Sequence, residues 1–204
     1  MATNFKEIFE SRYTWIEGFM RNVRRYSKRP AMISPEQGRT WNYSQLNSEV
    51  NRFCNALIRD GLQKGDVVMI QTLNCPEFAF AYVAAHKTHA VFCPVSFRLS
   101  AGELAFIIED SKPIVLLVCP QQLETALAAI NASNHKPKKL IVVGGKTGDA
   151  YVSYSDYVSS VSKEEPPFLC EYNIYDETTR LYTSGTTGRQ KAVPITSLNE
   201  VLSA

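Results

Sequence analysis

A regular alternation between residues 44 and 143 most constrains what this chain can fold into. Continuous apolar runs at 67–71, 90–95, 114–118 and 140–143 are separated by stretches whose apolar residues recur at helical spacing. Continuous runs rich in β-branched residues are typical of strands buried on both faces, whereas half-exposed strands alternate in polarity. The alternation therefore predicts an α/β fold with a doubly wound, mostly parallel sheet and helices on both faces.

Local signals mark where the predicted helices begin and end. Gly61 follows the helical stretch 44–60 and is expected to stop it. Ser100 and Glu103 have the spacing of a capping box, in which each residue bonds the backbone of the other at a helix start. Ser197 and Glu200 repeat that spacing near residue 204 and predict another helix start.

A basic, amphipathic stretch covers residues 12–29. Apolar side chains at 15, 16, 19, 20 and 23 share a helical face, and six arginines and lysines surround them. We interpret the stretch as a helix with a solvated basic face, and the alternative is a site for polyphosphate or nucleic acid. Twenty-two basic and twenty acidic residues leave the chain at +2, which argues against nucleic acid as a partner.

Cysteine usage and hydropathy indicate a cytoplasmic protein without a membrane span. Five cysteines are scattered without a C-x-x-C pair, and with three scattered histidines they give no zinc spacing. We expect all five to be reduced thiols. The longest apolar run, 78–85, is far shorter than the roughly 20 residues that a membrane helix needs. His86 and His89 follow an apolar helix and are expected to pack or face solvent.

The segment from 180 to 196 carries the chemistry. Leu181 and Tyr182 continue a predicted strand. Glycines and hydroxyl residues follow them, and the basic residues Arg189 and Lys191 come next. Glycine lets backbone N–H groups converge on an anion, hydroxyls add short donors, and lysine adds a point charge. The order G-T-T-G-R-Q-K is not that of a Walker A loop. The pattern predicts a polyphosphate cradle made by Thr183, Ser184, Gly185, Thr186, Thr187, Gly188, Arg189 and Lys191.

This string, residues 182–191, resembles the signature phosphate-binding loop of the AMP-forming acyl-CoA synthetases. That superfamily of adenylate-forming enzymes also includes adenylation domains of peptide synthetases and luciferases. Segments 29–33, 40–46, 61–68, 74–78 and 90–95, then Leu99 with Glu103 and Leu104, resemble other family blocks in the expected order. The resemblance covers about residue 20 to the end of the sequence.

Three residues depart from the family pattern. Gln190 stands where a proline usually precedes the lysine, and Ala192 stands where a glycine usually follows it. His89 stands where a glycine usually precedes Ala90. Loss of the proline predicts a more flexible loop, because it frees φ and restores a backbone donor. Ala192 requires a backbone with negative φ, or some strain.

The resemblance implies a two-step reaction with ATP, Mg²⁺ and coenzyme A. A carboxylic acid attacks the α-phosphate of ATP to give acyl-AMP and pyrophosphate, and coenzyme A then displaces AMP as the thioester. Carried over to this chain, residues 183–188 would cradle the β- and γ-phosphates. Lys191 would be the charged, catalytic contact. No metal-ligating residue of the chain is implied.

The resemblance also suggests a domain organisation. We expect an N-terminal helical segment at 1–28 and the first α/β subdomain of the family's N-terminal domain at 29–145. An irregular connection would follow at 146–179. A strand, the phosphate-binding loop and the start of a truncated second subdomain would occupy 180–204. We expect a fragment that is inactive alone and associates, for example as a homodimer, through a truncated face.

The sequence and the resemblance support three hypotheses about function. The first is the N-terminal part of an acyl-CoA synthetase, of fatty-acid type. The second is a non-catalytic nucleotide-binding or interaction module derived from that family. The third is an adenylation domain that loads a carrier protein.

Overall fold

The computed structural model describes residues 4–167, 171–184 and 190–203. Its elements, in chain order, are α1 (Phe5–Arg12), α2 (Trp15–Arg25), β1 (Pro30–Ser34), β2 (Arg39–Asn42), α3 (Tyr43–Arg59), β3 (Val67–Gln71), α4 (Pro76–Lys87), β4 (Val91–Pro94), α5 (Ala101–Ser111), β5 (Val115–Val118), the 3₁₀ turn η1 (Pro120–Gln122), α6 (Leu123–Ala132), β6 (Lys139–Val142), β7 (Val152–Ser153), α7 (Tyr154–Tyr157), β8 (Glu177–Ser184), β9 (Gln190–Thr196) and α8 (Ser197–Ser203).

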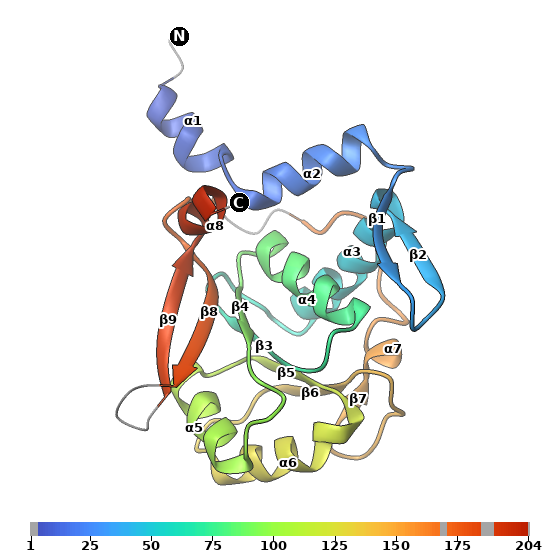
Figure 1. Ribbon diagram of the computed structural model, residues 1–204, viewed down its shortest axis with the longest axis vertical. Coiled ribbons are helices and arrows are strands. Elements are labelled where there is room, and N and C mark those ends of the chain that lie inside the picture. Colours follow the sequence, from blue (N-terminus) through green and yellow to red (C-terminus); the bar gives the residue numbers. More distant parts are fainter. Residues whose placement is uncertain (1–3, 168–170, 185–189, 204) are drawn as a thin grey trace.

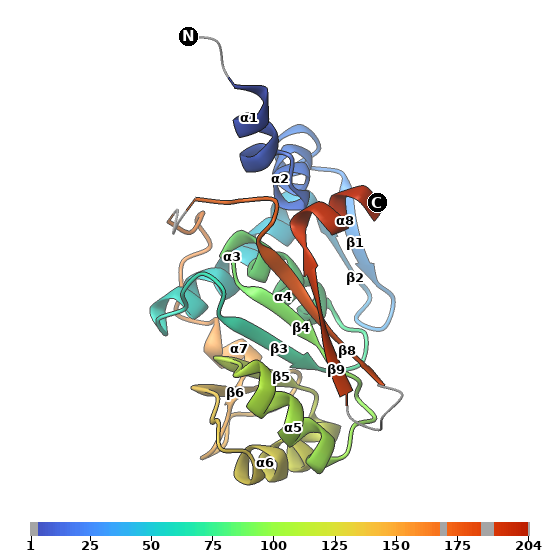
Figure 2. The same ribbon diagram turned by 90° about the vertical axis from the view of Figure 1, so that its left-hand side faces the viewer.

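The centre of the fold is a seven-stranded sheet in the order β7-β6-β5-β3-β4-β8-β9 (Figure 1). Neighbouring strands are parallel, except for the antiparallel pair β8 and β9. Helices α3 and α4 cover one face and α5 and α6 the other, as Figures 1 and 2 both show. The prediction of a doubly wound, mostly parallel sheet is confirmed.

Successive strand residues enter two separate cores, which explains the continuous apolar runs. In β3, Val68 and Ile70 pack with α3 and α4, whereas Val67 and Met69 pack with α5 and α6. Side chains alternate between the faces of a strand, so covering both faces requires apolar residues at every position. The five residues of β3 are all buried.

Two of the helix boundaries predicted from local signals are confirmed. Ser100 and Glu103 form the expected capping box at the start of α5, with both reciprocal hydrogen bonds in place. Gly61 follows α3 with a left-handed φ of 85°, which glycine adopts without strain. Helix α2 covers part of 12–29, but Thr14 caps its start by accepting from the Glu17 N–H, so the N-terminal segment contains two helices.

The predicted capping box at the start of α8 is wrong by one residue. Thr196, rather than Ser197, accepts from the Asn199 N–H at 3.3 Å, and Asn199 accepts from the Thr196 N–H at 3.0 Å. Glu200 is unavailable as a cap because its carboxylate bonds His86 and Thr179. Buried Ser197 is the first residue of the helix.

The region 146–179 is less irregular than predicted. It contains β7 at the edge of the sheet, the single-turn helix α7, and the start of β8 at Glu177. Tyr154 and Tyr157 are buried against Phe53, with ring centroids 5.5 and 6.0 Å from it. The boundary between two subdomains stays a prediction, although β8 and β9 belong to the same sheet as β3 to β6.

The described part of the chain also bears on the predictions about its cysteines and about membrane-spanning helices. Cys54, Cys75, Cys93 and Cys119 are free thiols, and Cys170 lies outside the described residues. Among the helices described, none combines the length and apolar character needed to cross a membrane.

Candidate functional site

The predicted phosphate cradle lies on the hairpin formed by β8 and β9. These strands pair so that Thr183 is opposite Lys191 and Ser184 is opposite Gln190. Residues 185–189, which join the strands, lie outside the described residues. The structure therefore places Thr183 and Lys191 together, and of Ser184 it describes the backbone alone. Gly185, Thr186, Thr187, Gly188 and Arg189 stay predictions.

Thr183 and Lys191 share one face of the hairpin. Residues directly opposite in an antiparallel pair have Cβ atoms about 4.5–5.5 Å apart and project to the same side. Both of these side chains are exposed. The arrangement sets a hydroxyl donor beside an ammonium group at the end of the hairpin nearest residues 185–189. Such a pair of donors suits a phosphate oxygen.

The position of the hairpin in the sheet also fits a ligand site. Strand β8 runs parallel to β4, so Ser184 lies at the edge of the sheet where the parallel strands end. In doubly wound sheets, ligands bind outside the carboxyl ends of the strands. The glycine- and hydroxyl-rich segment thus follows a strand at the edge where this architecture places its sites.

The departures from the family pattern have local explanations. Gln190 begins β9 opposite Ser184, a place where a residue with a backbone donor can pair. Ala192 lies within β9 opposite Tyr182 and is not among the described non-glycine residues with positive φ, which are His89 and Lys112. Ala192 therefore fits without the strain considered above. Greater flexibility of the loop stays a prediction.

Tyr182 anchors the hairpin to the opposite face of the sheet. Its side chain packs with the α5 and α6 core, and its hydroxyl donates to Asp110 Oδ2 at 2.5 Å. Burial, and then the hydrogen bond and charge of Asp110, raise the pKa of Tyr182 well above its ordinary value. Tyr182 is thus a neutral donor that ties β8 to the end of α5 beside the candidate site.

The other end of the hairpin is held by a second polar group. Thr179 and Glu200 are hydrogen bonded, and Glu200 also contacts His86. Arg180 donates two 2.7 Å hydrogen bonds to Glu177. His86 is fully buried, which confirms that it packs. Neither Asp110 nor Glu200 could be identified from sequence, because their partners are 72 and 114 residues away along the chain.

The described residues offer no ready-made metal centre. No three of their histidine, cysteine, aspartate or glutamate side chains are grouped so that they could hold an ion. A magnesium ion bound to a nucleotide does not need such a group, because Mg²⁺ often keeps waters and is held by substrate phosphates with one or two carboxylates.

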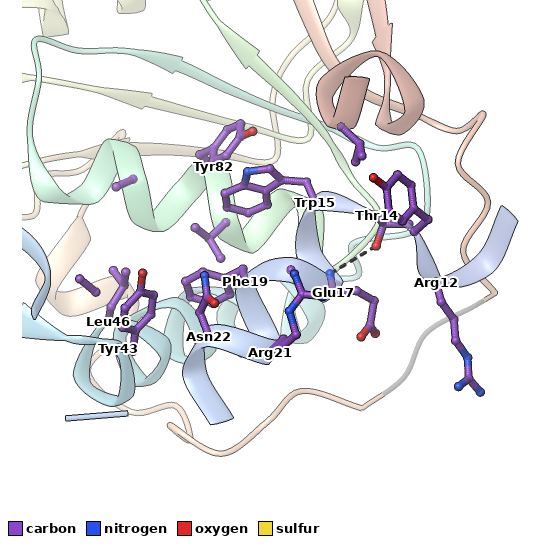
Figure 3. Close-up of a pocket in the computed structure, with 16 residues that line it drawn as sticks. Arg12, Thr14, Trp15, Glu17, Phe19, Arg21, Asn22, Tyr43, Leu46 and Tyr82 are labelled. Carbon is purple, nitrogen blue, oxygen red and sulfur yellow. Dashed lines mark hydrogen bonds between the residues drawn. The ribbon is translucent and has the colours of Figure 1, made fainter. Parts of the chain in front are cut away.

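A cavity of about 570 Å³ lies away from the hairpin end, beside α2 and α4 (Figure 3). Trp15 and Phe19 of α2 and Tyr82 of α4 form its apolar wall, and Arg12 and Arg21 are at its rim. It reaches α8 at Val201. Arg12 of α1 and Arg21 of α2 are therefore near a groove, but this groove does not include Thr183 or Lys191.

Comparisons with known proteins identify related sequences and structures. A family model described as AMP-binding enzyme matches residues 19–204. The crotonobetaine/carnitine–CoA ligase of Salmonella paratyphi B is 34% identical over 164 residues, covering 79% of this chain and 31% of that protein. The chain thus spans less than a third of this curated relative.

Solved structures share the fold. The anthranilate CoA ligase AuaEII, solved in complex with anthranoyl-AMP, has a TM-score of 0.84 at 22% identity, covering 96% of this chain and 36% of that one. A fatty acyl CoA synthetase from Mycobacterium tuberculosis has a TM-score of 0.76 at 26% identity, covering 91% of this chain and 35% of that one.

Proposed function

Because the chain belongs to the AMP-binding enzyme family, we propose that it supplies the first α/β unit and phosphate-binding hairpin of an ATP-dependent acyl-CoA ligase. The proposed enzyme converts a carboxylate and ATP to acyl-AMP and pyrophosphate, and then transfers the acyl group to coenzyme A. The observation that carries the proposal is the pairing of Thr183 with Lys191 beside a glycine- and hydroxyl-rich segment at the carboxyl edge of the sheet.

The chemistry of adenylation explains why such a hairpin is needed. A carboxylate approaches a polyanion, and negative charge builds on the departing pyrophosphate, so fixed positive potential is required around the β- and γ-phosphates. Lys191 would supply the charge, Arg189 would add to it, and residues 183–188 would supply hydroxyl and backbone donors. Mg²⁺ bound to the phosphates would neutralise charge further. In an active ligase, Lys191→Ala would slow adenylation roughly 10²–10³-fold.

For the acyl group we propose a fatty-acid-type substrate. Support comes from a solved relative called a fatty acyl CoA synthetase. Other names specify crotonobetaine or carnitine and anthranilate, so a panel of acids should include all three classes. Coenzyme A as acceptor is supported by the CoA-ligase names, with loading of a carrier protein as the alternative. The free cysteines support a cytoplasmic location.

The experiment is calorimetric titration of the 204-residue chain with MgATP. We expect binding that Lys191→Ala weakens by at least about tenfold, the scale of one charge-assisted contact. Lys139→Ala is the matched control. Lys139 is also an exposed strand lysine, but it begins β6 and so lies at the edge of the sheet where the parallel strands start, away from the candidate site. This control should bind like the wild type.

The outcomes separate the alternatives. Equal weakening by both substitutions would point to non-specific attraction and contradict the assigned site. Binding that depends on Lys191 would support the cradle, and acyl-AMP formation from an acid in the panel would then favour a ligase over a non-catalytic nucleotide-binding module. Absence of binding to the wild-type chain would contradict a preformed cradle.

A further inference from the structure

His86 lies between two hydrogen-bond acceptors in the interior of the protein. Its side chain has no exposed surface. Nδ1 is 2.8 Å from the Tyr82 carbonyl oxygen, and Nε2 is 2.8 Å from Glu200 Oε2. A neutral imidazole has a single N–H, so it can satisfy one of these acceptors but not an ionised partner at the other. The geometry therefore requires one additional proton, held between the ring and the carboxylate.

Glu200 extends this contact to the base of the hairpin. Its second oxygen, Oε1, accepts a 2.8 Å hydrogen bond from Thr179 Oγ1. Thr179 is opposite Phe92, which is the one register pair recorded between β8 and β4 in the described part of the chain. The carboxylate thus joins α4, α8 and the point at which the hairpin attaches to the sheet.

Aromatic rings flank His86. The ring centroids of Trp15 and Tyr82 lie 5.2 and 4.3 Å from the centroid of His86, with the ring planes tilted to each other. Burial acts to raise the pKa of Glu200, but hydrogen bonding and attraction to His86, together with the Thr179 bond, lower it below its ordinary value. Glu200 is therefore an ionised carboxylate at neutral pH, and its Oε2 atom needs an N–H donor from the ring.

Other titratable and charged groups share a cavity with His86. A cavity of about 590 Å³ borders His86. Besides His86, the titratable or charged residues that line it are Arg12, Glu17, Lys87, His89, Glu165, Glu171 and Tyr172. Lys87 and Glu165 are already paired with each other at 2.5 Å. Glu200 is the carboxylate in direct contact with the ring.

We propose that His86, Glu200 and Thr179 form a proton-dependent clasp that positions the β8–β9 hairpin. With the shared proton in place, the clasp fixes α8 and the base of the hairpin against α4. When the shared proton is lost, the Nε2 lone pair of His86 faces a carboxylate, and the clasp opens. His86 is thus a positioning residue, and its effect on phosphate binding rests on the function proposed above.

The pH dependence has a defined sign. On the acid side, Glu200 has a lowered pKa in the folded protein, so its contribution is present above about pH 4.3 and is lost as the pH falls further. Loss of the shared proton at high pH opens the clasp, so α8 is expected to lose stability in both directions.

A ¹⁵N long-range NMR spectrum of the full chain tests the protonation directly. The chain has three histidines, so the His89→Asn and His135→Asn variants assign the His86 signals. We expect both ring nitrogens of His86 to be protonated at neutral pH. A neutral tautomer with unprotonated Nε2 would overturn the proposal.

Glu200→Gln tests whether the clasp depends on the shared proton or only on the geometry of its hydrogen bonds. A glutamine amide can donate to Nε2 of a neutral ring and still accept from Thr179, so it preserves the connections without the extra proton. In the wild type, we expect hydrogen-exchange protection of α8 to fall about tenfold between about pH 6 and pH 9 after correction for intrinsic rates, the scale of one charge-assisted hydrogen bond. In Glu200→Gln, protection should be independent of pH over that range.

Thr179→Val is the matched control, because it removes the third member of the clasp but leaves His86 and Glu200 together. It should retain the wild-type pH dependence at lower overall protection. Identical pH profiles for the wild type and Glu200→Gln, or an α8 unprotected at every pH, would contradict the clasp. A confirmed clasp in a chain that does not bind MgATP would instead count against the proposed function.

Discussion

His89 shows how one residue can carry opposing contributions to stability. Its φ is 57°, in the left-handed region that costs most side chains about 1–2 kcal/mol. The ring packs on Tyr172 with centroids 4.7 Å apart, which recovers part of this cost. The related family usually has glycine here, and the observed φ explains that preference.

Removal of the His89 ring should change how stability depends on pH. Burial lowers the pKa of His89 to about 4, Lys64 acts in the same direction and Asp176 opposes it. An unfolded histidine titrates near pH 6.5, so the folded state binds fewer protons and loses stability as the pH falls from about 6.5 to about 4. Urea unfolding of His89→Asn should show a shallower loss, because asparagine tolerates the left-handed region and does not titrate. Parallel pH curves for the two proteins would contradict this account.

The sequence located the candidate residues but not their environments. A glycine- and hydroxyl-rich string after a strand is sufficient to propose a phosphate cradle, and the register then places Thr183 beside Lys191. Nothing local marks Asp110 as the partner of Tyr182, because such contacts arise when distant elements pack. The same reason explains why the prediction of Glu200 as a helix cap is wrong.

At the scale of elements, the β8–β9 hairpin is held at both ends by side chains. Tyr182 bonds Asp110 of α5 near the candidate site, and Thr179 bonds Glu200 of α8 at the base. Between these points the strands support each other through their own antiparallel register. The orientation of the hairpin relative to the sheet therefore depends on these two side-chain bonds together with the pairing of β8 with β4.

A double-mutant cycle on Tyr182→Phe and Asp110→Ala should reveal the first anchor. We expect a coupling energy of about 1 kcal/mol, since the hydrogen bond has a charged acceptor but is partly exposed. Chemical unfolding of the four proteins gives this value. Effects of the two substitutions that simply add would show that the contact does not hold the hairpin.

Two element boundaries were predicted correctly because their chemistry is local. The α5 capping box and Gly61 behave as expected because caps and left-handed turns involve neighbours in sequence. Strand β7 was missed because it has only two residues, Val152 and Ser153, at the edge of the sheet. Such a strand forms through pairing with β6 and has no periodicity of its own.

At the scale of the whole molecule, a polar tie fastens the segment near residue 165 to the domain. Lys87 donates to Glu165 at 2.5 Å and to the amide oxygens of Asn47 and Asn51 at 2.8 and 2.6 Å. Asn51 in turn donates to the Lys163 carbonyl. The lysine side chain is 6% exposed, whereas that of Glu165 is 53% exposed.

The difference in burial between Lys87 and Glu165 predicts unequal effects of their substitution on stability. Lys87→Ala should destabilise the protein by about 1–3 kcal/mol, because it leaves several acceptors without their donor in a largely buried site. Glu165→Ala should cost less, about 1 kcal/mol or below, since the lysine keeps two amide acceptors. Thermal or chemical unfolding measures both, and a larger effect of Glu165→Ala would contradict the assignment.

The overall architecture follows from hydropathy, but the strand order does not. Continuous apolar runs require a sheet covered on both faces, whatever the order of its strands. Placement of β8 beside β4, which brings the hairpin to the carboxyl edge, depends on packing between segments more than 80 residues apart, as in the pair Phe92 and Thr179. That placement brings the glycine- and hydroxyl-rich segment after β8 to the edge of the sheet where ligands bind.

The most direct test of the central claim is a ¹H–¹⁵N NMR titration of the chain with MgATP. If the hairpin binds the phosphates, the largest amide shifts will map to residues 183–191 and will be absent in Lys191→Ala. Shifts centred on the cavity beside Trp15 and Tyr82, or shifts at the hairpin that persist without Lys191, would contradict the account.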